Sequence, residues 1–298
     1  MARRIKTTKT DTERRAEAEQ LQATIAEQVE RLRTSEAWTQ FVTFAQQFHR
    51  YSLNNVLLIL AACPTATHVA GYRTWQKLGR QVRKGERGIR IFGGRDVTVT
   101  VEDANGDEKE ERRTRFFPVS VFDLSQTEAI DPDAPEPAEL AQRLTGDDPA
   151  GILDAVTDYL TGKGWTVDRE PIAGQTNGFT TIDGTKRVVI DSTLAPAQAA
   201  KTGLHEAAHV LMHADEQDAA AQYAAHRGIK ETEAESVAYI VAGILGLDTS
   251  AYSIGYVAGW SESDVDLIKS TAAAVLRTAH TLADALTVTD TAEAVEAA

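Results

Sequence analysis

The chain has 298 residues, of which 42% are hydrophobic and 25% charged, a composition typical of a soluble globular protein with room for two domains. No apolar run approaches the ~20 residues of a membrane span, no signal peptide follows Met1, and the single Cys63 excludes an internal disulfide, so we expect a cytoplasmic protein with no membrane partner. The net charge of −13 is uneven: residues 1–125 carry 21 Lys and Arg against 16 Asp and Glu, whereas residues 126–298 carry 10 against 28.

The first part of the chain is predicted to be helical. One helical stretch runs from Thr10 to about Arg33, and a second runs from its cap at Ser35 to about Ala62, before Pro64. In the second helix, apolar residues recur at helical spacing and are expected to form core. They are Trp38, Phe41, Val42, Phe44, Ala45 and Phe48.

A basic segment follows, between residues 71 and 92. Seven Lys and Arg fall within residues 71–90 against the single acid Glu86, with aromatic residues and glycines between them. Cations neutralise phosphates and flat rings stack on unpaired bases, so this composition favours single-stranded DNA; the alternative is a solvated basic loop with Trp75 buried. The residues expected to contact DNA are Tyr51, Tyr72, Arg73, Trp75, Lys77, Arg80, Arg83, Lys84 and Arg87.

A hairpin and a linker complete the first half. Residues 97–101 and 115–122 alternate as strands around a turn at Asn105-Gly106, so the first domain is expected to be α+β. Residues 125–137 contain three prolines and several acids, which is typical of a semi-stiff linker. We therefore predict a first domain over 1–127 with its core from about residue 10, a linker over 128–140 and a second domain over 141–298.

The second domain is predicted to be mostly helical with a small sheet. A helix over 149–162 precedes a strand over 164–169 and a hairpin of 178–182 with 187–190, turning at Asp183-Gly184. An alanine-rich helix follows Pro196, an acidic helix begins near Lys230, and a last helix runs from Ser261. Residues 292–298 are expected to fray.

The alanine-rich helix contains His205-Glu206-Ala207-Ala208-His209, an HExxH motif. On a helix, the two imidazoles lie one turn apart on the same face, where they can bind one Zn²⁺, and Glu206 lies at its flank as the natural general base. The motif predicts a zinc hydrolase. The alternative is an alanine-rich helix with exposed histidines.

A third ligand is needed to complete such a site. A third His in the metzincin spacing is excluded, because the Gly position of that pattern is Met212 and no His lies six residues after His209. His213 lies about 12 Å along the helix from His205, too far to share the ion, and is read as a supporting, substrate-facing or surface residue. Glu231 and Glu235 share one face of the acidic helix, while Glu233 is expected to point elsewhere.

We assign Glu231 as the third ligand and Glu235 as the carboxylate that holds a ligand imidazole, with the reverse assignment open. A solvated acidic helix start is the alternative. Residues 253–260 are expected to line the cleft. An oxyanion donor is expected from one of Tyr223, His226, Tyr239 and Tyr252, among which the sequence does not choose.

Several blocks of this sequence resemble a known family. Residues 48–55, 71–75, 82–89 and 121–127, in that order, resemble the N-terminal domain of ArdC-type antirestriction proteins. The segments 205–213 and 231–235 resemble the zincin domain of that family and, more loosely, the ImmA/IrrE metallopeptidases. Ala208 departs from the Gly common at this position in relatives. The resemblance implies single-stranded DNA binding by the first domain and a metallopeptidase fold in the second.

Together these interpretations predict an antirestriction-type protein of mobile genetic elements or phage defence. We expect it to bind single-stranded DNA and to hydrolyse a peptide bond in an unknown protein or peptide substrate, with Zn²⁺ as cofactor and Glu206 as base. Two alternatives remain open. One is a non-catalytic shield that protects DNA and keeps a structural or vestigial metal; the other is an ImmA-like protease that cleaves a repressor.

Overall fold

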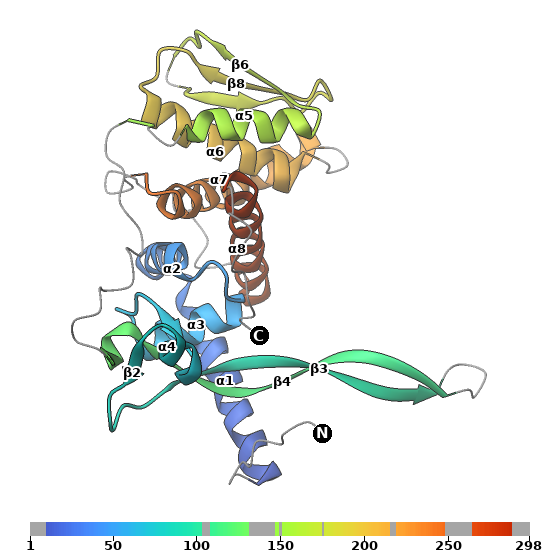
Figure 1. Cartoon of the computed structure of the whole chain (residues 1–298). Helices are drawn as coiled ribbons and strands as arrows, with labels where there is room; N and C mark the ends of the chain where they lie inside the picture. Colours follow the sequence, from blue (N-terminus) through green and yellow to red (C-terminus); the bar gives the residue numbers. More distant parts are fainter. Residues whose placement is uncertain are drawn as a thin grey trace. The chain divides into compact units, whose positions relative to one another are not determined.

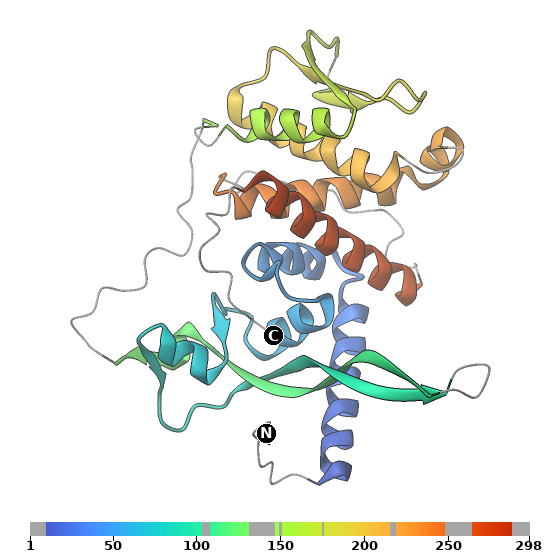
Figure 2. The same cartoon turned by 45° about the vertical axis from the view of Figure 1, so that its right-hand side comes forward.

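The computed structural model describes residues 10–102, 108–130, 147–148, 151–174, 176–214, 219–247 and 264–287. Contacts divide the chain into two compact units, the first made of residues 1–28, 57–135 and 291–298 and the second of residues 29–56 and 136–290. The architecture is α+β, with helices predominating and small sheets in both units (Figures 1 and 2). None of the described helices is long and apolar enough to cross a membrane.

The first unit is built around a long β-ribbon. Its strands β3 (Ile89–Glu102) and β4 (Glu108–Asp123) pair antiparallel from Ile89↔Val121 to Glu102↔Glu108, which confirms the predicted hairpin and lengthens it. The turn predicted at Asn105-Gly106 lies outside the described residues. In both views the outer part of the ribbon extends past helix α1 with no other element of its unit beside it (Figures 1 and 2).

Short elements cover the inner end of the ribbon. Strand β1 pairs with the end of β4, and β2 pairs with β5, which follows a single 3₁₀ turn. The basic segment contributes α4, β2 and the start of β3, and its residues 83–88 form an exposed loop between β2 and β3 that carries Arg83, Lys84 and Arg87. These elements are α1 (Asp11–Arg31), β1 (Val69–Ala70), α4 (Tyr72–Lys77), β2 (Arg80–Val82) and β5 (Thr127–Ala129).

The prediction of one helix from Ser35 to Ala62 is wrong. The structure has two, α2 (Ser35–Phe48) and α3 (Leu53–Ala62). The cap of α2 is Thr34, whose hydroxyl accepts from the Ala37 N–H at 3.2 Å, and at the break the Ser52 hydroxyl accepts from the Asn55 N–H at 3.4 Å. A hydroxyl that caps a new helix start competes with continuation of the old one. The apolar face predicted on α2 is buried, which confirms it as core.

Helix α2 packs in the second unit, on α7 (Ala219–Ile244). The Trp38 indole Nε1–H donates to Ser236 Oγ at 3.0 Å, and the Gln46 amide donates to the Tyr239 carbonyl at 3.1 Å. Residues 29–56 are thus structural parts of the unit that contains the HExxH helix. The predicted domain boundaries remain a prediction, and residues 131–140 of the predicted linker lie outside the described residues.

The rest of the second unit is a small sheet packed with helices. Its strand order is β6-β8-β7, with β6 parallel and β7 antiparallel to the central, buried β8. The predicted hairpin of the second domain is confirmed by the β7–β8 pairing. Residues 253–260 and 292–298 lie outside the described residues. The elements are α5 (Ile152–Gly162), β6 (Thr166–Glu170), β7 (Gly178–Thr180), β8 (Arg187–Asp191), α6 (Pro196–His213) and α8 (Val265–Leu286).

Candidate metal centre

Helix α6 carries the HExxH motif at the centre of the second unit. It begins at Pro196, whose missing N–H costs nothing in the first turn, and its alanines pack without side-chain entropy loss. Ala199, Ala200, Ala207 and Ala208 are buried, so neighbouring elements approach the helix closely. The small side chains therefore place the motif beside α7 and the sheet.

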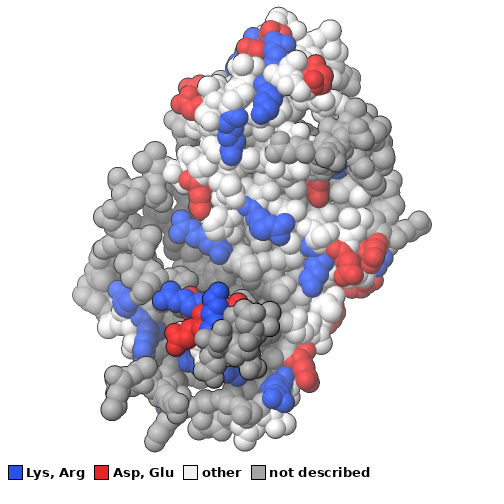
Figure 3. Space-filling view, turned by 90° about the vertical axis from the view of Figure 1, so that its right-hand side faces the viewer, with Lys and Arg blue, Asp and Glu red and all other residues white. Residues whose placement is uncertain are grey.

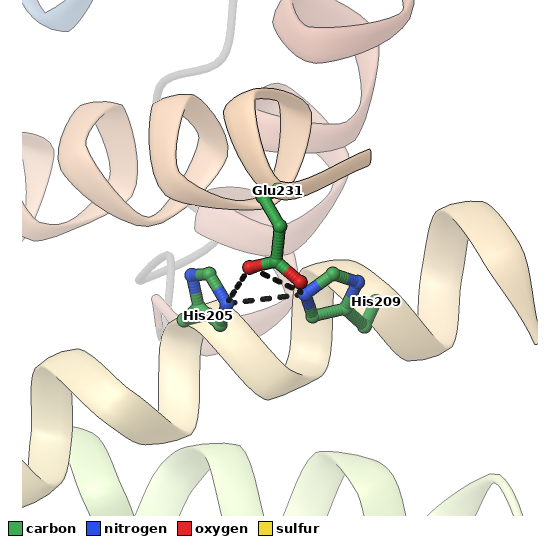
Figure 4. Close-up of side chains that lie close together, drawn as sticks. All are labelled: His205, His209 and Glu231. Atoms are coloured by element: carbon green, nitrogen blue, oxygen red, sulfur yellow. Dashed lines mark hydrogen bonds and ion pairs between the residues drawn. The ribbon is translucent and has the colours of Figure 1, made fainter. Parts of the chain in front are cut away.

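Two histidines of α6 and one glutamate of α7 converge on one point (Figure 4). The His205 and His209 Nε2 atoms lie 3.1 Å apart, and Glu231 Oε2 lies 3.4 Å from the first and 3.8 Å from the second. Donor atoms about 2.0 to 2.1 Å from one ion at tetrahedral angles would lie about 3.4 Å apart. The three side chains are thus spaced as ligands of a single ion.

Glu235 lies on the other side of the His205 ring. Its Oε2 accepts from His205 Nδ1 at 3.0 Å, and its Oε1 accepts from the Lys201 ammonium at 3.0 Å. A proton held on Nδ1 by this contact leaves the Nε2 lone pair for a metal. Of the two glutamates left open by the sequence, Glu231 faces the Nε2 atoms and Glu235 faces Nδ1.

Glu206 is held from the sheet. It is 4% exposed, and the Thr180 hydroxyl of β7 donates to its Oε2 at 2.7 Å. The approach of β7 depends on Gly178, because a Cβ there would lie 2.6 Å from Thr202 Cγ2 and 2.9 Å from the Val189 carbonyl oxygen. Strand β7 thus fixes one oxygen of the carboxylate.

Burial and charge set the protonation of this cluster. Burial raises the pKa of Glu206, although His205, His209 and the Thr180 hydrogen bond oppose the shift. Burial lowers the pKa of His205, but the stronger combined effect of Glu231, Glu235 and Glu206 raises it to about 9. For Glu235, burial is outweighed by contacts with His205 and Lys201, so its pKa falls. A metal ion must therefore displace a proton from His205 on binding.

A cavity of about 430 Å³ opens at this cluster. Its polar wall contains His205, Glu206, His209 and Glu231, and its other wall is formed by the β7–β8 hairpin with apolar side chains. Phe179 and Ile182 are 42% and 50% exposed and both line the cavity. The remaining lining includes Trp165, Thr176, Gly178, Thr180, Thr181, His213 and Lys230.

His213 lies beyond the ligand cluster on α6. It is 8% exposed, its ring centroid lies 5.5 Å from that of His209, and its Nε2 lies 3.5 Å from Glu233 Oε2. His213 is thus a buried residue of the cavity wall and not a surface residue. Glu233 points elsewhere than Glu231 and Glu235, as expected, and its carboxylate lies near His213 instead of the His205 and His209 cluster.

The expected oxyanion donors receive no support from the described residues. Tyr239 is 8% exposed, and its hydroxyl lies 3.1 Å from the Thr43 hydroxyl of α2. The side chains of Tyr223 and His226, and Tyr252 as a whole, lie outside the described residues. Two further positioning residues, Lys201 and Thr180, are not predicted from the sequence. Lys201 could have been identified, because it lies one helical turn before His205.

Some of the residues predicted to contact DNA are buried in the fold, and others are exposed. Trp75 is 3% exposed with its indole donating to the Phe122 carbonyl at 2.9 Å, and Arg80 is 8% exposed with its Nε donating to Thr127 Oγ1 at 2.8 Å. Both side chains stabilise the fold, so we no longer expect them to contact DNA. Tyr51 is half-buried, and Arg83 bonds to Glu86 and the Ser125 carbonyl. The exposed members are Tyr72, Arg73, Lys77, Arg83, Lys84 and Arg87.

Models of two known domain families match separate parts of the chain. The model of the N-terminal domain of anti-restriction factor ArdC matches residues 15–122, and that of the IrrE N-terminal-like domain, a peptidase family, matches residues 162–252. An uncharacterized protein of Bacillus anthracis is 26% identical over 266 residues, 76% of this chain but only 44% of that protein, so the chain spans less than half of this relative.

Two crystal structures of the antirestriction protein ArdC from plasmid R388 are also similar. The metal-free structure is 22% identical with a TM-score of 0.48 and covers 78% of this chain and 84% of that one. The Mn(II)-bound structure is 20% identical with a TM-score of 0.42 and covers 78% and 82%.

Proposed function

We propose that this chain, which matches the ArdC N-terminal domain over residues 15–122 and the IrrE-like domain over residues 162–252, is an antirestriction-type protein that binds single-stranded DNA and hydrolyses peptide bonds. The metal centre for hydrolysis would be formed by His205, His209 and Glu231. The observation that carries the proposal is the convergence of these three donors within 4.8 Å of one another, with the Glu206 carboxylate at their flank.

The donor set fits a divalent cation. Two imidazoles and one carboxylate are the ligands of many catalytic zinc sites, which keep a fourth position open. The cavity at the cluster provides space for that position, and the Glu235 contact fixes the imidazole orientation that binding requires. Zinc suits these ligands best, since imidazole sites bind it more tightly than manganese. A bound ion would polarise the scissile carbonyl and acidify water.

The residues of the chain would then perform the proton transfers. Thr180 holds Glu206 Oε2, which leaves Oε1 to accept a proton from the attacking water. The water oxygen bonds to the carbonyl carbon, the C–N bond breaks, and Glu206 returns the proton to the leaving nitrogen. The burial that raises the pKa of Glu206 brings it closer to the operating pH of a general base.

An extended peptide is the substrate form that the site favours. Strand β7 pairs with β8 on one side only and, among the described residues, its other edge has no partner strand. Such an edge can take a peptide as an added strand by main-chain hydrogen bonds. Phe179 and Ile182 offer apolar surface to a neighbouring substrate side chain. We therefore expect cleavage of unfolded segments next to apolar residues.

The test is cleavage of an unstructured protein such as casein, followed by mass spectrometry of the new termini. We expect zinc-loaded protein to cut and Glu206→Gln to lose at least ~10³-fold in rate while keeping its metal, because only the base is removed. Glu36→Gln, an exposed carboxylate on α2, is the matched control. Equal cutting by Glu206→Gln would refute the mechanism. If the wild-type protein does not cleave casein, but the wild type and Glu206→Gln protect single-stranded DNA from restriction equally well, the protein is a non-catalytic DNA shield.

A further inference from the structure

The outer part of the β3–β4 ribbon carries an arginine pair that the fold does not explain. Arg95 and Arg115 are directly opposite each other across the two strands, so both side chains lie on one face of the ribbon. Both are exposed, and neither has a carboxylate partner among the described residues. Like charges placed directly opposite destabilise a strand pair, so this arrangement costs stability. An unfavourable charge pair that brings no structural benefit is typical of a functional site.

An aromatic ring lies beside this pair on the same face. Phe117 is 37% exposed, and the Arg95 guanidinium carbon lies 5.9 Å from its ring centroid. The residue opposite Phe117 is Gly93, so no side chain faces the ring across the ribbon. A Cβ at Gly93 would lie 2.8 Å from Val119 Cγ1, which keeps the position small. Arg95, Arg115 and Phe117 thus place two cations and an accessible ring on one face of a two-stranded ribbon.

The opposite face of the ribbon lacks this combination. Phe116 is 68% exposed and packs over Gly94, where a Cβ would lie 3.4 Å from its ring. Its neighbour on that face is Asp96, which accepts a hydrogen bond from Thr114 at 2.9 Å and would repel a phosphate. Further out on the face of Arg95 and Arg115, Arg113 pairs with Glu111 at 2.8 Å. Arg112 also lies on the opposite face, but it faces Thr98 and is four residues from Phe116. In the described part of the ribbon, only Arg95 and Arg115 thus place two arginines directly opposite each other beside a ring.

The surrounding surface is not uniformly basic. On the face drawn in Figure 3, the described Lys and Arg are interspersed with Asp and Glu. A ligand for the arginine pair must be recognised locally, by a phosphate within reach of both guanidinium groups and by a flat group against Phe117.

We propose that the Arg95–Arg115–Phe117 face of the ribbon is a second contact site for single-stranded DNA, which holds one or two phosphates between the arginines and stacks an unpaired base on Phe117. Paired guanidinium groups match phosphate oxygens, and an aromatic ring stacks on any base without sequence preference. The inference rests on the proposed DNA binding and extends it from the basic segment at residues 72–87 to the ribbon.

The experiment is fluorescence anisotropy of a labelled oligonucleotide of mixed sequence, about 30 nucleotides long, with the full-length protein at several salt concentrations. We expect Arg95→Gln/Arg115→Gln to bind about tenfold more weakly and to lower the slope of log affinity against log salt by about 0.7 if one phosphate contact is lost and by about 1.4 if two are lost. Phe117→Leu should weaken binding about five- to tenfold with the slope unchanged.

Matched controls lie on the other face of the same strands. Arg112→Gln removes one exposed arginine of the ribbon, and Phe116→Leu removes a ring that is more exposed than Phe117. Both should bind like the wild type. Thermal unfolding should show that Arg95→Gln/Arg115→Gln is no less stable than the wild type, since the substitution relieves repulsion.

The outcomes separate the inference from the proposed function. If the wild type binds and Arg73→Gln/Lys77→Gln weakens binding, but Arg95→Gln/Arg115→Gln and Phe117→Leu behave like their controls, the ribbon site is refuted while DNA binding stands. If the wild-type protein does not bind single strands at all, the proposed DNA binding is refuted, and the ribbon site with it.

Discussion

At the residue scale, a chain of three charged groups orients the first histidine of the motif. Lys201 donates to Glu235 Oε1, and Glu235 Oε2 accepts from His205 Nδ1, both at 3.0 Å. Glu235 is intermediate in exposure and has both oxygens engaged, so its position is well determined. Contacts of this kind fix the tautomer of a metal-binding imidazole and raise its basicity.

Glu235→Gln should therefore weaken metal affinity without removing a ligand. We expect a ~10- to 100-fold rise in the zinc dissociation constant, since the amide cannot pair equally well with Lys201 and the imidazole. Competition with a chromophoric chelator measures it. Glu170→Gln, an exposed carboxylate on β6, is the control. Unchanged affinity in Glu235→Gln would show that the carboxylate does not orient His205.

The sequence specifies part of this centre. His205, Glu206 and His209 follow from their spacing on one helix, because both ligands and the base lie within a single turn. The choice between Glu231 and Glu235 depends on how α7 crosses α6, which no local pattern encodes. Thr180 comes from a strand brought to the helix by the sheet, and nothing in its neighbourhood marks it.

At the scale of elements, strong periodicity was read correctly and interruptions were missed. The ribbon and the buried face of α2 follow from alternation and from helical spacing. The break between α2 and α3 carries no such signal, because residues 49–52 contain no Gly or Pro; α2 ends with His49 as its C-cap, and the Ser52 hydroxyl caps the start of α3. Trp75 and Arg80 look like ligand-binding residues by type, but tertiary contacts bury them.

Asp123 illustrates how one buried side chain ties elements together. It is 1% exposed at the end of β4, and its carboxylate accepts from the N–H groups of Thr67, His68 and Ser125 at 2.9 to 3.2 Å. Burial raises its pKa, but these hydrogen bonds and the Ser125 hydroxyl together bring it below the ordinary value of 3.8. The carboxylate form thus stabilises the first unit.

Asp123→Asn should destabilise the first unit by about 1 to 3 kcal/mol at pH 7, because buried N–H groups lose a charged acceptor. Since the folded pKa lies below the unfolded value, this stabilisation is full above pH 3.8 and is lost as the pH falls through the folded pKa. Urea unfolding at pH 7 and at about pH 2, well below the unfolded pKa, measures the difference. A penalty that is absent at pH 7, or equal at both pH values, would contradict this account.

At the scale of the whole molecule, the second unit includes a segment from the first half of the sequence. Residues 29–56 belong with residues 136–290, and α2 buries Trp38, Phe41 and Phe48 in that unit. The charge asymmetry and the Pro-rich segment suggested a simple division near residue 127. Sequence composition does not reveal that α2 packs with the second unit, because an apolar helix face does not specify which element will pack against it.

A fragment of residues 141–298 should therefore be unstable alone. We expect the same fragment with residues 29–56 joined by a flexible linker to be at least about 3 kcal/mol more stable, since it restores several large buried side chains to α7. Denaturant unfolding of the two fragments measures this, and the fused fragment carrying Trp38→Ala serves as the control. Equal stability of the two fragments would show that the second domain is self-sufficient.

The measurement that tests the metal centre most directly is the zinc content of the full-length protein after dialysis against zinc and then buffer, compared with Glu231→Gln and Glu233→Gln. These two variants change neighbouring carboxylates on α7, one facing the imidazole Nε2 atoms and the other facing His213. We expect about one zinc per chain in the wild type and in Glu233→Gln and almost none in Glu231→Gln. A folded wild-type protein without zinc, or full retention by Glu231→Gln, would contradict the proposed His205, His209 and Glu231 centre.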